Sequence, residues 1–349
     1  MPTLTGAKLA NVTASALDYY LNTPEVYYQS IQQKPLVALM ERKKKTFSGG
    51  KKDISVGIKG DFGAAGVNDS LKGFDLSDTV TFYEPENTRR AAYPWKEHHI
   101  GFNVTHSELK IDGLVVVDTD GEDTRPLSGR EKHVLADILD EKSQDFMEQY
   151  ARSLNALLWG DGTTDAKGLA GIRAFITDNP ATGLVGGVDR ASATWWRNRF
   201  NLGIVSNVAD GGALLQFLQK ELRQLRRYGG NPDAYFCGSD WIDALEKERR
   251  ANGLYGESGA SGRTDASVGD VAHGSLVPTY DPTLDDLGMS KRAYIFDSSR
   301  LFLDALQGDW KRQHTPSRPY NQFVTYRSIV STGAVVASQL NCCGVYAIT

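Results

Sequence analysis

One stretch, residues 128–159, constrains the fold more than any other part of the chain. Ser128 and Glu131 form a capping-box pattern at its start, and Gly160 stops it. A helix of this length would be about 45 Å long. It suits a strut across an elongated subunit and equally a long helix in an ordinary core. Its apolar residues recur three, four or seven positions apart, on one helical face: Leu135, Ile138, Leu139, Phe146, Tyr150, Leu154, Leu157 and Leu158.

The composition predicts a globular chain that folds in a reducing compartment. Hydrophobic residues make up 40% and charged residues 23% of the 349 positions, which excludes a disordered chain and allows two domains. The net charge of −4 excludes a global basic field. The basic residues 42–45 are a local patch, which we interpret as a solvated linker. The cysteines are too few for a disulfide framework, and no run is long and apolar enough to predict a membrane segment.

The first 52 residues predict an extended arm. Pro24 and Pro35 interrupt the segment, and the run from Lys43 to Lys52 is strongly basic. An arm with so much aromatic surface and so little core must bury it elsewhere, and a neighbouring subunit is the natural candidate. We expect intersubunit contacts from Tyr19, Tyr20, Tyr27 and Tyr28.

Residues 53–98 predict an extended loop. ISVGIKG, from residue 54, alternates like a strand, and Ile100, Phe102 and Val104 alternate in the next strand after the loop. The strand-like ends suggest a two-stranded hairpin, which has too little core to be stable alone. We therefore expect the loop to lie on another chain, burying Phe62, Leu71, Phe74 and Phe82.

The rest of the chain predicts an α/β region after a short strand at residues 172–176. The spacing of leucines predicts a helix within 210–233, and Ser239 precedes an amphipathic pattern that predicts a second helix. Short apolar runs predict strands at 234–238, 274–282, 293–297 and 301–306, and a strand pair at 323–349.

No catalytic, cofactor-binding or metal-binding constellation stands out. The acidic run DTDGED (118–123) lacks the spacing of an EF-hand loop, so we interpret it as a solvated turn. His98 and His106 share a strand face but lie too far apart to bind one metal. Glycine-rich phosphate loops, the nucleophile elbow and paired-cysteine metal motifs are all missing from the sequence. The sequence therefore predicts no catalytic, cofactor or metal site.

The passage 168–200 resembles the major capsid proteins of tailed bacteriophages. It follows the long amphipathic stretch, as it does in that family. The matching residues are Gly168-Leu169, Asp178-Asn179-Pro180, Thr182-Gly183, Val185-Gly186-Gly187-Val188-Asp189-Arg190 and Trp195-Trp196-Arg197-Asn198.

The resemblance implies the α+β fold of the Hong Kong 97-type capsid proteins. It also implies a structural subunit, not an enzyme, which self-assembles into the hexamers and pentamers of an icosahedral head around double-stranded DNA. The implied parts are an N-terminal arm (1–52), an extended loop that forms a β-hairpin (53–98), a peripheral domain (99–189) with spine helix 128–159, an axial domain (190–321) and return strands to the peripheral domain (322–349).

The resemblance also implies partners and a location. The chain would bind itself and the portal, with a possible decoration protein. No long charged coiled coil precedes the arm, so we expect either a separate scaffolding protein or a sequence that is the mature form. The subunit would assemble in the host cytoplasm, reside in the virion, and enclose DNA without sequence-specific binding, cofactors or contact with a membrane.

Two other functions stay open at this point. An encapsulin-like compartment resembles the same fold and would enclose protein cargo. An α/β enzyme with its site in residues 190–321 fits the alternation of helices and strands, although no acid, base or nucleophile constellation supports it.

Overall fold

The computed structural model consists of two compact units. The smaller unit consists of Met1–Gln32, His99–Arg152 and Lys311–Val330, and the larger unit consists of Gln33–His98, Ser153–Trp310 and Ser331–Thr349. The structure describes residues 32–60, 73–79, 87–105, 145–207, 212–251, 276–314 and 324–349.

The two helices predicted between residues 210 and 251 are confirmed, whereas a predicted strand is wrong. Residues 172–176 form a turn of helix, because Ile172, Phe175 and Ile176 are spaced to share a helical face and all three are buried there. The predicted long helix is helical over 145–159, and its residues 128–144 lie outside the described part. The described helices are α2 (Pro35–Arg42), residues 145–159, α5 (Ile172–Phe175), the 3-10 helix η1 (Thr194–Trp196), α6 (Ala213–Arg226), α7 (Ser239–Ala251) and α8 (Pro282–Asp286).

Strands occur in both units. The extended loop contributes β2 (Asp53–Lys59) and β3 (Thr88–Pro94). The smaller unit contains most of β4 (Lys96–Thr105), together with β12 (Arg312–His314) and the first part of β13 (Val324–Ala337). The others are β1 (Lys45–Phe47), β5 (Leu184–Val185), β6 (Val188–Asp189), β7 (Arg199–Ile204), β8 (Ala234–Cys237), β9 (Thr279–Tyr280), β10 (Arg292–Phe296), β11 (Leu301–Leu306) and β14 (Gly344–Ile348).

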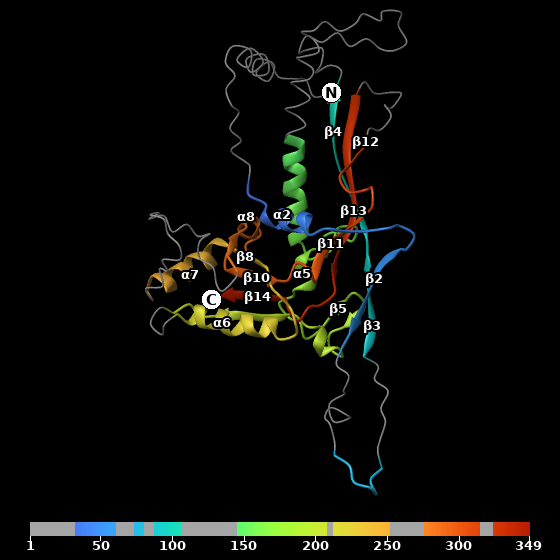
Figure 1. The fold of residues 1–349 in the computed structure, drawn as a ribbon. Helices are drawn as coiled ribbons and strands as arrows, with labels where there is room; N and C mark the ends of the chain where they lie inside the picture. Colours follow the sequence, from blue (N-terminus) through green and yellow to red (C-terminus); the bar gives the residue numbers. More distant parts are fainter. Residues whose placement is uncertain are drawn as a thin grey trace, which may run out of the picture. The chain divides into compact units, whose positions relative to one another are not determined.

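A five-stranded sheet organises the core of the larger unit. Its strand order is β7-β14-β10-β8-β9, so β14 pairs with strands from the predicted axial domain. Helices α6 and α7 cover one face of this sheet (Figure 1) and bury their leucines, Trp241 and Ile242 against Tyr235, Ile295 and Tyr346. This apolar layer stabilises the sheet, because burial removes about 25 cal/mol of unfavourable hydration per Å² of apolar surface.

Glu248 of α7 fixes where α6 begins. Gly212 precedes α6 and has no side chain to cap it. The buried Glu248 carboxylate instead accepts hydrogen bonds from the backbone N–H groups of Leu214 and Leu215, both at 3.1 Å. It also accepts from the Ser206 hydroxyl at 3.0 Å. A negative group at a helix N-terminus is favourable, so one residue ties the two helices together.

A second sheet of the larger unit joins β1, β11 and residues 331–337 of β13. β11 and this part of β13 run antiparallel, with Leu303 opposite Val335, and both side chains are buried. Helix α2 begins at Pro35, which favours a first helical turn, and it buries Leu36 and Met40 completely. The end of the arm is therefore part of the packed core.

The extended loop contains a hairpin, but its predicted second strand is wrong: the strand with Ile100, Phe102 and Val104 is β4, which pairs with β13, and the partner of β2 is β3. β2 pairs antiparallel with β3, from Asp53 opposite Pro94 to Lys59 opposite Thr88. β3 contains Arg89, Arg90 and Pro94, so its apolar alternation is hidden. Its inward residues are Ala91 and Tyr93, both buried.

In the smaller unit, β4 and β12 both pair with β13. Arg312 lies opposite Val330 in the antiparallel register of β12. The Phe102 ring on β4 lies 4.9 Å, centroid to centroid, from Phe146 of the helical residues 145–152. This aromatic pair packs the helix on the strand. The domain boundaries expected at residues 52, 98, 189 and 321 stay predictions.

Candidate assembly surfaces

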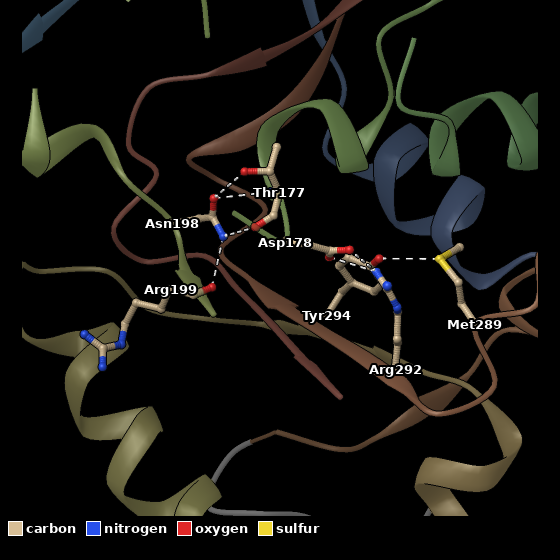
Figure 2. Close-up of polar contacts among 7 residues, drawn as sticks. All are labelled: Thr177, Asp178, Asn198, Arg199, Met289, Arg292 and Tyr294. Carbon is tan, nitrogen blue, oxygen red and sulfur yellow. Dashed lines mark hydrogen bonds and ion pairs between the residues drawn. The ribbon is translucent and has the colours of Figure 1, made fainter. Parts of the chain in front are cut away.

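The passage 168–200 forms a network of buried polar contacts, which we call the polar hub. Asn198 lies at its centre, 3% exposed. Its side-chain oxygen accepts from the Thr177 N–H at 3.2 Å, and its amide nitrogen donates to the carbonyls of Thr177 and Arg199, both at 3.0 Å (Figure 2). One side chain therefore satisfies three backbone groups and joins the chain before and after the glycine-rich turns.

An ion pair connects the polar hub to the five-stranded sheet. The Arg292 guanidinium donates to both carboxylate oxygens of Asp178 at 2.8 Å (Figure 2). Arg292 belongs to β10, whose neighbour Tyr294 is buried and donates its hydroxyl to the Met289 sulfur at 3.6 Å. Because the pair is partly exposed, solvent screens it, and it contributes modestly to stability.

Arg190 is a buried cation inside the polar hub. Its guanidinium donates to the Thr177 hydroxyl at 2.6 Å and to the Phe175 carbonyl, while its Nε has no hydrogen-bond partner. Burial lowers the pKa of Arg190 to about 10, partly opposed by the Tyr93 hydroxyl. The side chain stays protonated at neutral pH, and its carbonyl contact helps to hold the turn after α5.

The two adjacent tryptophans have different surroundings. Trp196 is 2% exposed and donates its indole N–H to the Val185 carbonyl at 3.2 Å. Trp195 is half-buried, and its ring lies so close to Gly60 that a Cβ there would overlap the indole. Trp196 therefore anchors the polar hub, and Trp195 fixes the root of the extended loop.

A groove of about 900 Å³ opens beside Trp195, and we call it the Trp195 groove. It runs between the end of β2, the start of β7 and the turn before β14. Of its four aromatic lining residues, Phe200 and Tyr228 are 51% and 60% exposed, and the other two are Trp195 and Trp196. Its charged lining residues are all basic: Lys59, Arg197 and Arg199.

Residues 73–79 of the extended loop, which we call the loop tip, expose apolar side chains. Phe74 is 72% exposed and Leu76 is fully exposed. The Asp78 carboxylate accepts from the Asp75 N–H at 2.9 Å, and the Asp78 N–H donates to the Asp75 carbonyl at 3.0 Å, which defines a local turn. The turn leaves both apolar side chains in solvent, so their burial requires another surface.

A buried carboxylate positions α8. Asp281 caps this helix by accepting from the Thr283 N–H at 3.0 Å, and it also accepts from the Trp159 indole at 2.7 Å and the Asn155 amide at 3.2 Å. Burial raises the pKa of Asp281, and these hydrogen bonds oppose that rise. The Asn155 oxygen in turn accepts from the Val37 N–H at 3.3 Å, so α2, the long helix and α8 share one network.

Of the predicted contact residues, only Phe74 lies in the described part, and there it is exposed. Tyr19, Tyr20, Tyr27, Tyr28, Phe62, Leu71 and Phe82 lie outside it, as does the acidic run 118–123. Sequence reasoning missed Leu76, Phe200 and Tyr228. An isolated apolar residue gives no local sign of its exposure. The exposure of Phe200 depends on the place of β7 at a sheet edge, and Leu76 and Tyr228 lie in turns.

Within the described ranges, no three His, Cys, Asp or Glu side chains gather closely enough to bind a metal ion. The cysteines there, Cys237, Cys342 and Cys343, are free and buried. No helix in the described part has the length and apolar character to cross a membrane.

Comparison with known proteins gives a match at the level of structure. No family model and no curated protein matches the sequence. The capsid asymmetric unit of cyanophage A-1(L) is similar with a TM-score of 0.59 and 15% identity, covering 92% of this chain and 94% of that chain. The capsid of a native GTA particle gives 0.55 and 15%, covering 97% and 98%. A chain from Gordonia phage Cozz gives 0.52 and 14%, covering 93% and 89%.

These likenesses extend over nearly the whole of each chain. At such low identity they establish the fold and not the contacts of individual residues. The chain therefore has the fold of phage capsid proteins, with mixed helices and sheets, as the sequence resemblance implied.

Proposed function

We propose that the chain is the major capsid subunit of a tailed bacteriophage, a structural protein and not an enzyme. It assembles into the hexamers and pentamers of an icosahedral head that encloses double-stranded DNA. The observation that carries this proposal is the likeness to the cyanophage A-1(L) capsid chain, which covers 92% of this chain and 94% of the other.

The proposal extends to the Hong Kong 97-type arrangement of parts. Residues 1–52 are the arm and 53–98 the extended loop. The peripheral domain spans 99–189 with the spine helix 128–159, and the axial domain spans 190–321. Of the return strands in 322–349, β13 pairs with β4 of the peripheral domain, whereas β14 pairs with β7 and β10 of the axial domain. The paired stem β2–β3 and the helical residues 145–159 support the loop and spine assignments.

The arm and the extended loop act as straps between subunits. Phe74 and Leu76 at the loop tip support this role, because fully burying one such side chain contributes about 1.5–3 kcal/mol. The contact repeats at every subunit of a closed ring, so a modest gain per copy becomes large for the shell. In the same way, Tyr19, Tyr20, Tyr27 and Tyr28 of the arm, with Phe62, Leu71 and Phe82 of the loop, pack on a neighbour.

The wall encloses DNA without adhering to it strongly. The net charge of −4 supports this, because tight phosphate binding requires many uncompensated cations. The subunit works with a portal and a separate scaffolding protein, with a possible decoration protein, and it assembles in the host cytoplasm and resides in the virion.

Expression of the full chain tests the proposal. We expect the purified protein to sediment as large particles or capsomers, and negative-stain images to show closed shells or rings. Co-expression with the scaffolding protein of the same phage is the matched second condition, because scaffold can be required for closure. A protein that stays monomeric in both conditions would contradict the proposed function.

A further inference from the structure

The five-stranded sheet of the larger unit has two unlike edges. Its outer strands are β7 and β9, and in the described part of the chain neither pairs with a further strand. With neighbouring strands about 4.8 Å apart, the two edges lie about 19 Å from each other in one copy. Surfaces at opposite edges of one sheet cannot meet within a subunit.

The edge at β7 is basic, and we define the basic edge as Arg197, Phe200, Leu202, Lys220, Arg223, Arg227 and Tyr228. Lys220, Arg223 and Arg227 are exposed on or just after α6. In the described residues 194–207 and 212–228, the one acidic residue is Glu221, which is buried and paired with Arg199. Within these two described ranges, no acidic side chain other than Glu221 offsets the positive charges of this edge.

The basic edge also exposes apolar surface. Phe200 lies opposite Val345 on β14, and the same face continues to Tyr294 on β10. Val345 and Tyr294 are fully buried, whereas Phe200 is 51% and Leu202 36% exposed. The cover over this face thus ends before β7, and the Trp195 groove opens beside Phe200.

The edge at β9 is acidic, and we define the acidic edge as Val277, Tyr280, Asp285, Asp286 and Leu287. Residues 276–290 contain no lysine, arginine or histidine. Val277, Tyr280 and Leu287 are 40%, 38% and 44% exposed. The Tyr280 hydroxyl donates to Asp285 at 2.8 Å, and this bond, with burial and the other nearby carboxylates, raises the pKa of Tyr280 to about 12.

We propose that the basic edge of one copy binds the acidic edge of the next copy, head to tail. The two surfaces carry charges of opposite sign, and each exposes apolar residues. Both features favour a specific heterologous contact. Repetition of such a contact closes a ring when the rotation between copies permits it. The Trp195 groove provides space for side chains of the acidic edge such as Leu287. The proposal rests on the proposed function and names the lateral contact within a capsomer.

Charge reversal on each edge tests the contact. Arg223→Glu and Asp286→Lys both change exposed side chains. Each variant alone should raise the protein concentration needed for half-assembly by about tenfold or more at low salt, since like charges then face each other. Lys167→Glu is the matched control, because Lys167 is exposed and lies outside both edges. The readout is sedimentation, with circular dichroism to verify folding.

Mixing the two single variants gives the sharpest result. In the mixture, the reversed edge of one variant meets the reversed edge of the other, so alternating copies should regain six-membered rings. A five-membered ring cannot alternate and keeps one mismatched contact. The combined variant, with both changes in one chain, should regain both rings, because each reversed edge then meets a reversed edge. The protein concentration that the wild type needs for half-assembly should also rise between 0.1 and 1 M salt, because the Debye length falls from about 10 to 3 Å.

The outcomes separate the two proposals. Wild-type shells together with unimpaired Arg223→Glu and Asp286→Lys shells would overturn the head-to-tail contact and leave the proposed function standing. A basic-edge variant that assembles normally but no longer binds duplex DNA would assign that edge to nucleic acid and overturn the contact too. A wild type that never assembles would overturn both. If a reversal unfolds the subunit, the neutral pair Arg223→Gln and Asp286→Asn repeats the test with a smaller expected shift.

Discussion

The polar hub buries its central side chains and gives them hydrogen-bond partners, whereas the loop tip exposes its side chains to solvent. In the hub, Asn198 satisfies three backbone groups within the subunit, and Trp196 is buried with its indole N–H bonded. In the tip, Phe74 and Leu76 stand in solvent, and the polar contacts are limited to a local turn. The side chains of the polar hub find their partners within the subunit, and the apolar side chains of the loop tip do not.

This difference separates stability from assembly. Changes in the hub should lower the free energy of unfolding of a single subunit, because they leave buried groups unpaired or create cavities. Changes at the tip should leave that free energy nearly unchanged and weaken contacts between subunits. Four variants, taken from the largest expected change in unfolding free energy to the smallest, test this division.

Trp196→Ala should have the largest effect. It removes a buried ring and should lower the free energy of unfolding by about 3–5 kcal/mol. Denaturant titration of the unassembled subunit measures this. Trp195→Ala is the matched control, because that ring is half-buried, and it should have less than half the effect. Equal losses in the two variants would show that Trp196 is not the anchor.

Asn198→Ala should have the second largest effect. It leaves the N–H and the carbonyl of Thr177 without their side-chain partner and should destabilise the subunit by about 2 kcal/mol. The control is Asn201→Ala, which removes only a local contact to the Gly203 N–H. Thermal unfolding of both variants gives the comparison, and a loss below that of Asn201→Ala would remove Asn198 from the centre of the polar hub.

Asp178→Ala should cost less, about 1 kcal/mol or below, because the ion pair with Arg292 is partly exposed. A double-mutant cycle with Arg292→Gln isolates the pair, and the coupling energy should shrink as salt is raised. A coupling energy that does not change between low and high salt would contradict the view that solvent screens this pair.

The double variant Phe74→Ser with Leu76→Ser should change the unfolding free energy least, by less than about 0.5 kcal/mol. It should nevertheless abolish or strongly weaken assembly. Sedimentation measures assembly, and amide exchange of the wild-type loop should slow on assembly. The control is Leu184→Ser, which replaces a residue of similar exposure (71%) outside the loop tip and both sheet edges. Normal shells from the double variant would place the loop tip outside the subunit contacts.

Local pattern predicts much of this fold and little of its pairing. The leucine spacing of α6 and the capping pattern before α7 predict both helices, because a helical face is a property of neighbouring residues. Arg89 and Arg90 obscure the alternation of apolar and polar residues in β3. The segment 172–176 is too short to distinguish the two-residue repeat of a strand from the three- and four-residue spacing of a helix.

The polar hub shows the same limit for the site. Its residues lie in the passage that resembles capsid proteins, yet Arg292, the partner of Asp178, is 114 positions away in the sequence. Such a pair depends on how β10 is placed in the sheet, which no local pattern encodes. The exposed Phe74 is consistent with the predicted intersubunit role, and that role stays a prediction.

The place of β14 in the sheet bears on how the chain is made. β7 pairs only with β14 among the described strands, and β14 follows the other four strands of its sheet in the sequence. Thr349 and Ile204, which share a backbone hydrogen bond, are 145 residues apart. At a synthesis rate of about 5–20 residues per second, a ribosome needs on the order of ten seconds to extend the chain from Ile204 to Thr349. During that interval β7 has no neighbour and Phe200 and Leu202 are open to water, so a host chaperone that covers residues 199–204 should raise the yield of folded subunit.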